Sequence, residues 1–252
     1  MRDPYAGLAS VYDGMARDPG IRRYYGEWRR ALLEAAAERG VKGRVLVDLA
    51  CGTGNSTVPW TRNRGWTVVG VDQSAAMLRV ARRKSRRVRW VRQDITRLDI
   101  PFRADLVTCH FDALNHVLGA RGLQQVFTRV GRLLQPGGLF QFDLNTVHWL
   151  RWLNGREKLF RAGPHVFTAS NEFDEKTGIA TFHQYWFVRT GRLYQMRHVL
   201  VRERAFTDTR IRVMLRKAGL RLIRSSVQTM IDGKPGRKLY IAARAPRRGR
   251  GR

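Results

Sequence analysis

The chain has 252 residues, of which 43% are hydrophobic, and a formal net charge of +28. This length suffices for one α/β domain with an insertion and a sizeable core. No apolar run reaches about 18 residues, which excludes an ordinary membrane-spanning helix, and the first residues lack the apolar stretch of a signal peptide. Two cysteines, Cys51 and Cys109, are too few for a disulfide framework, so we expect a cytoplasmic protein.

The positive charge comes almost entirely from arginine, with 41 Arg and 7 Lys. Because phosphate binding depends on such side chains, the composition keeps nucleic acid open as a partner. Arginine spread from end to end is also what codon bias in a GC-rich genome produces. The densest clusters are residues 79–92, on a predicted helix and its exit, and 244–252, of which 245–252 are expected to form a basic disordered tail.

Residues 1–43 have a helical pattern and precede the first predicted strand. The segment carries several aromatic side chains: Tyr5, Tyr12, Tyr24, Tyr25 and Trp28. A stripe of such residues is typical of a helix that packs on a core, so packing alone explains most of them.

A short apolar strand begins at Val45 and ends with Asp48-Leu49, and a loop with Gly52 and Gly54 follows. Glycine permits backbone angles closed to other residues and lets a ligand lie against the main chain. Ligands of open α/β sheets bind at this place, beyond the carboxyl end of a strand. We expect the polar residues 55–57 to open a helix after the loop.

Two further strands each end in an acidic residue. The strand 67–71 ends at Asp72, where a carboxylate can accept hydrogen bonds from ribose hydroxyls. The strand 88–91 ends near Asp94 and Ile95, where a carboxylate suits the exocyclic amine of adenine. Glycine loop, ribose acceptor and base acceptor in this order predict a nucleoside site.

The loop also indicates which nucleoside binds. A dinucleotide fingerprint needs a third glycine where Thr57 stands, and no Gly-Lys-Ser/Thr sequence of a P-loop follows. The carboxylate of Asp48 repels pyrophosphate but suits an ammonium group. Adenosine combined with an amino-acid ammonium is S-adenosylmethionine. The sequences Asp-Leu-Ala-Cys-Gly-Thr-Gly (48–54), Gly-Val-Asp-Gln-Ser-Ala-Ala-Met-Leu (70–78) and Gln-Asp-Ile (93–95) resemble motifs of the class I S-adenosylmethionine-dependent methyltransferases.

This resemblance implies the cofactor-binding residues. They are Tyr12, Asp48, Ala50, Gly52, Gly54, Asp72, Gln73, Met77, Asp94, Ile95 and His110. In the small-molecule members of the family the N-terminal segment covers the cofactor, and the tyrosine of Tyr12-Asp13 then lies near the sulfonium, since an aromatic face attracts a cation. Packing of Tyr12 onto the core is an equal alternative.

The chain continues with a strand over 104–109, a helix over 121–134, a Gln-Pro-Gly-Gly turn at 135–138 and a strand over 139–144. The family implies a Rossmann-like α/β fold with a seven-stranded sheet in the order 3-2-1-4-5-7-6, in which strand seven is antiparallel. Residues 44–144 and 207–244 are expected to form this core.

Between residues 145 and 206 the pattern changes to an antiparallel β insertion after strand five. A short helix at 145–156 precedes three aromatic-rich strands at 165–173, 178–189 and 192–202, which are separated by good hairpin signals. Amine methyltransferases that this chain resembles carry such a cap over the substrate. A helix capped by Thr207 or Asp208 and ending at Lys217 follows, and then strands at 220–227 and 238–243.

The loop after strand four is expected to hold the catalytic group. His116 is the first candidate, because histidine titrates near neutrality and can accept a proton. Its segment, 108–116, is similar to that of amino-sugar N-methyltransferases, where a histidine falls at the same place. Asp112 and Asn115 either orient substrate or cap the next helix. The histidines in or near the cap could also touch substrate: His148, His183 and His198.

The sequence predicts an S-adenosylmethionine-dependent methyltransferase that acts on a small molecule, at nitrogen rather than oxygen. One alternative is an RNA or nucleic-acid methyltransferase that uses the basic surface, and another is a binding protein without turnover. Cys109 lacks the preceding proline of RNA cytosine methyltransferases, since Thr108 stands there. No Cys/His/carboxylate cluster has metal-ligand spacing, so no metal is expected.

Overall fold

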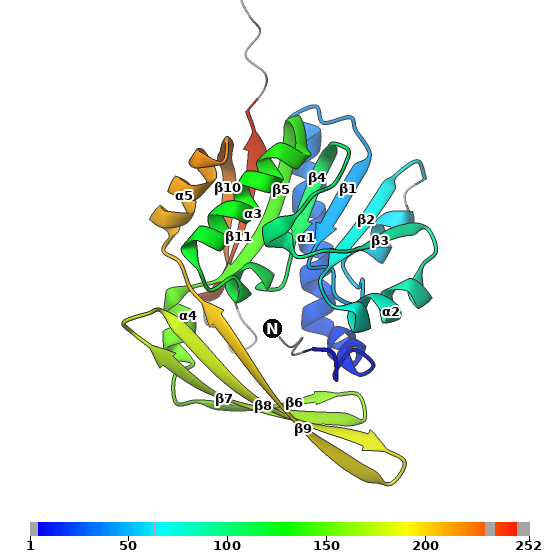
Figure 1. Ribbon diagram of the computed structural model, residues 1–252, viewed down its shortest axis with the longest axis vertical. Helices are drawn as coiled ribbons and strands as arrows, with labels where there is room; N and C mark the ends of the chain where they lie inside the picture. The colour runs from blue at the N-terminus through cyan, green and yellow to red at the C-terminus, as the bar shows by residue number, and fades with distance from the viewer. Residues whose placement is uncertain (1–4, 63, 230–234, 246–252) are drawn as a thin grey trace, which may run out of the picture.

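The computed structural model describes residues 5–62, 64–229 and 235–245, and the predicted tail beyond residue 245 lies outside them. Two sheets organise the chain, a seven-stranded one and a four-stranded one (Figure 1). Within the described ranges, no helix is long and apolar enough to cross a membrane.

The larger sheet has the predicted methyltransferase topology. Its order is β3-β2-β1-β4-β5-β11-β10, in which β11 is antiparallel to both of its neighbours. The strands are β1 (Val45–Leu49), β2 (Thr67–Asp72), β3 (Val88–Arg92), β4 (Ala104–Cys109), β5 (Leu134–Asn145), β10 (Leu220–Thr229) and β11 (Pro235–Arg244). The first five strands in the chain run parallel, so their carboxyl ends meet at one edge of the sheet.

Helices cover both faces of this sheet because its strands are apolar on both. On one face α3 (Ala120–Leu133) packs over β5, with Phe127 against Phe140 and Phe142, and α5 (Asp208–Lys217) packs beside α3 on the edge strand β10. On the other face α1 (Pro19–Glu38) buries Leu32 against Leu46 of β1. The helix α2 (Ala75–Lys84) lies beside β2 and β3 (Figure 1).

The smaller sheet is the predicted insertion between β5 and α5, and we call it the cap. Its order is β6-β7-β8-β9, all antiparallel, and the helix α4 (Val147–Trp152) leads into it. The strands are β6 (Glu157–Ala162), β7 (His165–Asp174), β8 (Ile179–Thr190) and β9 (Leu193–Arg204). Three strands were predicted and the prediction missed β6, because Lys158, Arg161 and the adjacent Gly163-Pro164 obscure its short alternation.

Two local predictions were wrong in detail. The loop after β1 leads not into an α-helix but into a short 3₁₀ helix, η2 (Val58–Arg62), and Gly65, at φ +81°, then turns the chain toward β2. The Gln-Pro-Gly-Gly segment lies within β5, where the pairing with β4 shifts between Ala104 and Leu106. This irregularity absorbs the turn residues without ending the strand.

The N-terminal segment lies between the core and the cap (Figure 1). Its turn buries Leu8 and Val11 in the cap's own hydrophobic cluster, which includes Trp186 of β8. A hydrogen bond from Arg197 of β9 to the carbonyl of Gly7 adds a polar contact. The segment then forms η1 (Tyr12–Arg17) and enters α1.

The packing of α3 yields a matched pair of glycine substitutions. A Cβ on Gly131 of α3 would lie 2.3 Å from the carbonyl oxygen of Ala218, whereas a Cβ on Gly26 of α1 would meet nothing within 4 Å. We expect Gly131→Ala to destabilise the protein by about 1–3 kcal/mol through overpacking. Gly26→Ala should stabilise it by roughly 0.5–1 kcal/mol through reduced backbone entropy. Chemical denaturation measures both, and equal effects would contradict this packing.

Candidate active site at the carboxyl edge of the sheet

The glycine loop after β1 has an unusual backbone. Ala50, Gly52 and Gly54 all have positive φ, at 51°, 55° and 82°. A Cβ on Gly54 would approach the Trp90 ring to 2.5 Å, so the loop lies against that indole and needs glycine there. A Cβ on Gly52 would meet nothing within 4 Å, so the main chain is open to close approach at this residue.

Asp48, in the strand β1, anchors the residues that follow the loop through hydrogen bonds. Its buried carboxylate accepts hydrogen bonds from the hydroxyls of Ser56 (2.7 Å), Thr57 (2.5 Å) and Thr108 (2.7 Å). These contacts explain why Thr57 replaces the third glycine of a dinucleotide loop: its hydroxyl is a partner of the strand-end carboxylate. The predicted contact between Asp48 and an ammonium group stays a prediction.

Asp72 lies at the end of β2, next to the loop. Its Oδ2 accepts from the Gly52 N–H and its Oδ1 from the Ser74 N–H, each at 2.8 Å. Met77, on the first turn of α2, packs with Tyr12 of the N-terminal segment. Burial, followed by the charges of Asp112 and Asp72, raises the pKa of Tyr12, so its phenol remains a hydrogen-bond donor at neutral pH.

The third strand end is more exposed. Asp94 caps the short η3 (Ile95–Arg97), and its Oδ1 accepts from both the N–H and the hydroxyl of Thr96 at 2.8 Å. Ile95 is half-buried, and Gln73 is exposed, with its carbonyl bonded to Arg92. The predicted cofactor residues of the three strand ends therefore lie along one edge of the sheet.

Asp13 fastens the N-terminal segment to the glycine loop. Its Oδ1 accepts hydrogen bonds from the Thr53 hydroxyl (2.6 Å), the Asn55 amide (3.1 Å) and the Lys84 ammonium (2.7 Å). Lys84 also donates to the side-chain amide oxygen Oδ1 of Asn55 at 2.7 Å. Burial is the largest single influence and would raise the pKa of Asp13, but the hydrogen bonds from Lys84, Thr53 and Asn55 and the charge of Lys84 together outweigh it, so the pKa is lowered. We call this group the Asp13 latch.

The loop after β4 is strained and is held by one arginine. Phe111 and Asp112 have φ of +56° and +51°, which non-glycine residues rarely adopt. Arg237, at the start of β11, lies 3.0 Å from the Asp112 carboxylate and 3.1 Å from that of Asp143. Its guanidinium also lies over the Phe111 and Trp28 rings, with centroid distances of 5.4 and 5.8 Å.

The electrostatics of Arg237 follow from this setting. Burial disfavours its charge, but Asp112, Asp143 and Glu203 together outweigh burial and raise the pKa of the guanidinium above its ordinary value. Burial raises the pKa of Asp143, although Arg237 opposes the shift. Arg237 therefore stays positively charged and interacts electrostatically with three acidic groups.

Glu203 brings the cap into this cluster from the end of β9. The Asn145 amide donates to Glu203 Oε2 at 2.8 Å and to Asp112 Oδ2 at 3.1 Å, so it bridges the two carboxyl groups. Burial, followed by the charge of Asp112, raises the pKa of Glu203 well above its usual value. The protonated form of Glu203 is therefore favoured, and its proton lies where it can be shared with Asp112.

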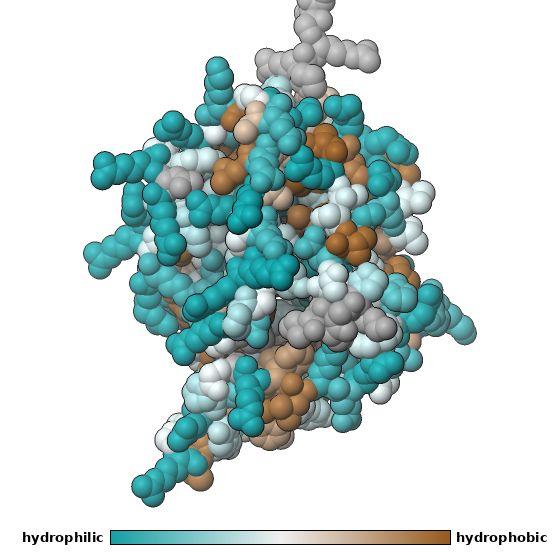
Figure 2. Space-filling model, turned by 180° about the vertical axis from the view of Figure 1, so that it is seen from behind, coloured by the Kyte–Doolittle hydropathy of each residue, from teal (hydrophilic) through white to brown (hydrophobic). Residues whose placement is uncertain are grey.

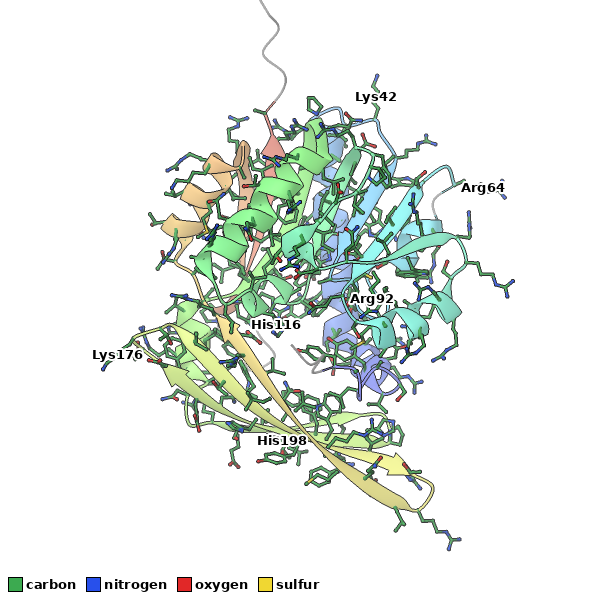
Figure 3. All side chains as sticks on the ribbon, viewed as in Figure 1. Lys42, Arg64, Arg92, His116, Lys176 and His198 are labelled. Atoms are coloured by element: carbon green, nitrogen blue, oxygen red, sulfur yellow. The ribbon has the colours of Figure 1, made fainter. Side chains whose placement is uncertain are left out.

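His116 ends the short η4 (Ala113–His116), at the lower edge of the core and facing the cap (Figure 3). Its Nδ1 lies 3.3 Å from the Arg202 carbonyl oxygen, and its Nε2 lies 3.4 Å from the Tyr5 hydroxyl. Burial lowers the pKa of His116, so the ring is neutral near pH 7. Because a carbonyl can only accept, the proton belongs on Nδ1 and the Nε2 lone pair faces Tyr5.

The other predicted polar residues lie at different distances from this cluster. His110 is buried, bonded to Gln141 and packed on Trp28. Asn115 does not cap a helix: its amide donates to the carbonyl oxygens of Asn145 and Arg204 and so joins β5 to the cap. His183 and His198 stack with each other across β8 and β9 (centroid distance 5.6 Å), on the side of the cap away from the core.

The trio Asp112, His116 and Glu203 places its ligand atoms within 4.8 Å of one another, a grouping that sequence spacing did not reveal. The Asn145 amide and Arg237 already occupy the carboxylates on this side. A shared proton, rather than a second cation beside Arg237, neutralises such a pair.

Cys109 is fully buried at the end of β4, and burial raises the pKa of its thiol well above the ordinary value. A protonated, enclosed thiol is a poor nucleophile, which argues against the cysteine mechanism of cytosine methylation.

The sequence prediction missed Glu203, Arg237, Asp143 and Asn145, which complete the cluster. One signal was present: Glu203 continues the inward-facing series Val199, Val201 along β9 and thus places a charge on the apolar face of a strand. No spacing connects it with Asp112, 91 residues earlier. Only the approach of the cap to the core pairs them.

The Asp13 latch predicts weaker cofactor binding when it is broken. We expect Asp13→Asn to raise the Kd for S-adenosylmethionine by about tenfold, equivalent to about 1.4 kcal/mol, because a charge-assisted hydrogen bond that holds the segment closed is lost. Calorimetry measures this, with Glu27→Gln, at an exposed ion pair, as control. An unchanged Kd together with a lowered Tm would show that Asp13 only stabilises the fold.

Glu203 predicts a pH-dependent stability change. Since its folded-state pKa is raised, the folded protein holds a proton that the unfolded chain releases, and stability falls as pH rises above about 4.5, by about 1.4 kcal/mol per pH unit until the folded-state pKa is reached. Glu203→Gln keeps the hydrogen bonds without titrating. We expect its Tm to match the native protein near pH 5 and to exceed it at pH 8; a gain independent of pH would contradict the shared proton.

Comparison with known proteins agrees with this geometry. The family described as "Methyltransferase domain" matches residues 46–138. The chain is 36% identical over 182 residues to a demethylmenaquinone methyltransferase of Mycobacterium tuberculosis. The alignment covers 67% of this chain and 71% of that protein. It is 29% identical over 149 residues to a putative methyltransferase of Geobacillus sp. (strain WCH70), covering 57% of this chain and only 58% of that protein.

Solved structures extend the likeness over almost the whole chain. An S-adenosylmethionine-dependent methyltransferase from Clostridium acetobutylicum superposes with a TM-score of 0.81 at 26% identity, covering 96% of this chain and 100% of that one. A sugar N-methyltransferase from Streptoalloteichus sp. shares the fold, with a TM-score of 0.74 at 19% identity, covering 93% and 92%. The chain belongs to the class I S-adenosylmethionine-dependent methyltransferases and is an enzyme that takes its methyl group from that cofactor.

Proposed function

We propose that this enzyme methylates an amine nitrogen of a small molecule that binds between the core edge and the cap. The observation that carries the proposal is neutral His116 beside a cluster in which three acidic groups, Asp112, Asp143 and Glu203, outnumber the one buried cation Arg237, in a chain of net charge +28. A site so different in charge from the rest of the molecule suits a basic acceptor.

The residues at the three strand ends fit the cofactor. The open main chain at Gly52 accommodates a ligand, the Asp72 carboxylate suits ribose hydroxyls, and Asp94 with Ile95 suits adenine. Tyr12 and Met77 would cover the sulfonium side, and the Asp13 latch would keep them there. When bound, the cofactor supplies a methyl group that its sulfonium has already activated for in-line displacement.

The acceptor-side residues would manage the proton of the amine. An ammonium group cannot attack, so it must lose a proton before transfer, and the Nε2 lone pair of His116 would accept it once the long contact with the Tyr5 hydroxyl (3.4 Å) gives way to the substrate. The carboxylate of Asp112 attracts the cationic amine, and the proton shared with Glu203 keeps the pair from repelling itself. Tyr5, on the N-terminal segment, orients the His116 ring.

Several features favour an amine over a hydroxyl. A hydroxyl needs a stronger base than a neutral histidine of lowered pKa, whereas an amine needs only a path for its proton. The sugar N-methyltransferase with the same fold acts on nitrogen, as its name states. Its low identity leaves the chemistry of Asp112 and His116 as the main support.

A nucleic-acid acceptor has less support. The exposed arginines of α2, Arg79, Arg82 and Arg83, lie on a helix beside β3, and the cluster near His116 lies instead at the end of β4 under the cap. The N-terminal segment and cap cover that edge, whereas a polymer needs an open path along its backbone.

His116→Gln is the decisive variant. We expect kcat to fall by roughly 10²- to 10⁴-fold with amine acceptors, since a positioned proton acceptor contributes about that much, while the Kd for the cofactor stays unchanged. In the native enzyme kcat should decrease on the acid side as His116 becomes protonated, at a pH below 6.5, and this limb should disappear in the variant. Radiolabelled methyl transfer to amine and hydroxyl metabolites, and to total RNA, provides the readout.

The matched control is His183→Gln, because that histidine lies on the far side of the cap. It should retain native kcat and cofactor affinity. Transfer confined to hydroxyl acceptors or to RNA would reject the amine assignment, and full activity of His116→Gln would reject the proton-acceptor role while leaving the family intact.

A further inference from the structure

The cap has an outer face that is left unpaired in the monomer. Along β7, β8 and β9 alternate residues point inward and are buried, among them Phe167, Trp186 and Val201. The exposed large hydrophobic residues of the described chain, apart from Val227 on β10, belong to the cap: Leu159, Tyr185, Leu193, Tyr194, Met196 and Leu200. Figure 2 likewise shows hydrophobic side chains gathered over the cap at the bottom of a largely hydrophilic face.

Strand register arranges the outer face in rows across the four strands. The central row is Leu159, Thr168, Tyr185 and His198. On one side of it lies the row Glu157, Ser170, His183 and Leu200, and on the other the row Arg161, Val166, Phe187 and Met196. We call these twelve residues the outer patch. Figure 3 shows His198 on this sheet, with side chains projecting on the side away from the core.

We propose that the outer patch is the interface of a homodimer, in which two caps pack face to face about a two-fold axis that crosses the strands along the central row. Such an axis places each strand over its own copy in the opposite direction. Leu200 then faces Met196 of the other copy, and Glu157 faces Arg161, twice each by symmetry. Leu159, Tyr185 and His198 lie near the axis and each face themselves.

Charge favours a second copy of this chain over other occupants. The outer patch carries one acid and one base, Glu157 and Arg161, and both lie on β6, so the patch is neutral and self-complementary within a chain of net charge +28. Beyond the Glu157 row the next row adds Glu172 and Arg202, one of each sign, and beyond the Arg161 row lies Arg189 opposite Tyr194. An anionic surface or nucleic acid would require a basic patch instead.

The area is also of the right order. Four strands span about 19 Å, and residues 194–202 of β9 span about 30 Å, which gives roughly 570 Å² in projection before side-chain relief is counted. A standard interface takes about 800 Å² of accessible surface from each partner. The flat projection is thus about seven-tenths of that area, and side-chain relief brings the face toward the size of a standard interface.

Salt should strengthen this dimer. Two copies of charge +28 repel each other through their surfaces, whereas the outer patch is neutral. Light scattering and sedimentation should therefore show a dimer at micromolar concentration in about 0.3 M salt, with a Kd that rises at least threefold at tenfold lower salt. A monomer at 100 µM in high salt would overturn the proposal, whatever other partner the face binds.

Substitutions test the location. Leu200→Arg and Tyr185→Arg should each raise the dimer Kd at least a hundredfold, whereas Val227→Arg, at a still more exposed residue on β10, should not change it. Circular dichroism and Tm verify that each variant is folded. A dimer unaffected by both cap substitutions would overturn the proposed interface.

Cross-linking provides a test that does not depend on destabilisation. Thr168→Cys lies near the proposed axis, and the native Cys51 and Cys109 are buried. Face-to-face sheets are about 10 Å apart, so a bismaleimide of that span should link two Thr168→Cys copies but not two Val227→Cys copies. Equal or absent linkage of both would contradict the geometry. Neither result bears on the acceptor.

Discussion

The guanidinium of Arg237 is the constraint on which the acceptor side of this enzyme depends. It pairs with Asp112 and Asp143 and lies over Trp28 and Phe111, so it binds β11, the β4 loop, β5 and α1 into one unit. A buried cation with two acidic partners costs desolvation energy that no single ion pair repays. Its position at the start of an antiparallel strand brings it to the edge where the parallel strands end.

Once this cation is in place, the strained turn at Phe111 and Asp112 becomes sustainable. Left-handed angles at two successive non-glycine residues cost on the order of 1–3 kcal/mol each. Three contacts to Asp112 stabilise the turn. Arg237 pairs with its carboxylate, the Asn145 amide donates to the same carboxylate, and the Asp143 carboxylate accepts from its N–H. Because η4 begins directly after Asp112, this turn also determines where His116 lies relative to the cap.

The cap and the N-terminal segment complete the site from outside the core. Asn115 and His116 bond to main-chain carbonyls near the end of β9, which fixes Glu203 beside Asp112. Leu8 and Val11 join the cap's hydrophobic cluster, while Asp13 bonds to the glycine loop. The same short segment therefore connects the acceptor side, through Tyr5, with the cofactor side, through Tyr12.

The sequence by itself indicated the cofactor class, because its apolar strands end in a glycine loop, Asp72 and Asp94 in an order that suits S-adenosylmethionine, and the family resemblance carried by these motifs implied the order of the strands. It also located the insertion and placed His116 in the loop after β4. Only the tertiary structure showed which charged residues surround Asp112. Glu203 and Arg237 lie 91 and 125 residues further along the chain, and no local periodicity links them to Asp112. Which charged residues pair depends on which lie close together in the folded chain, because a buried charge without a partner costs a large free energy.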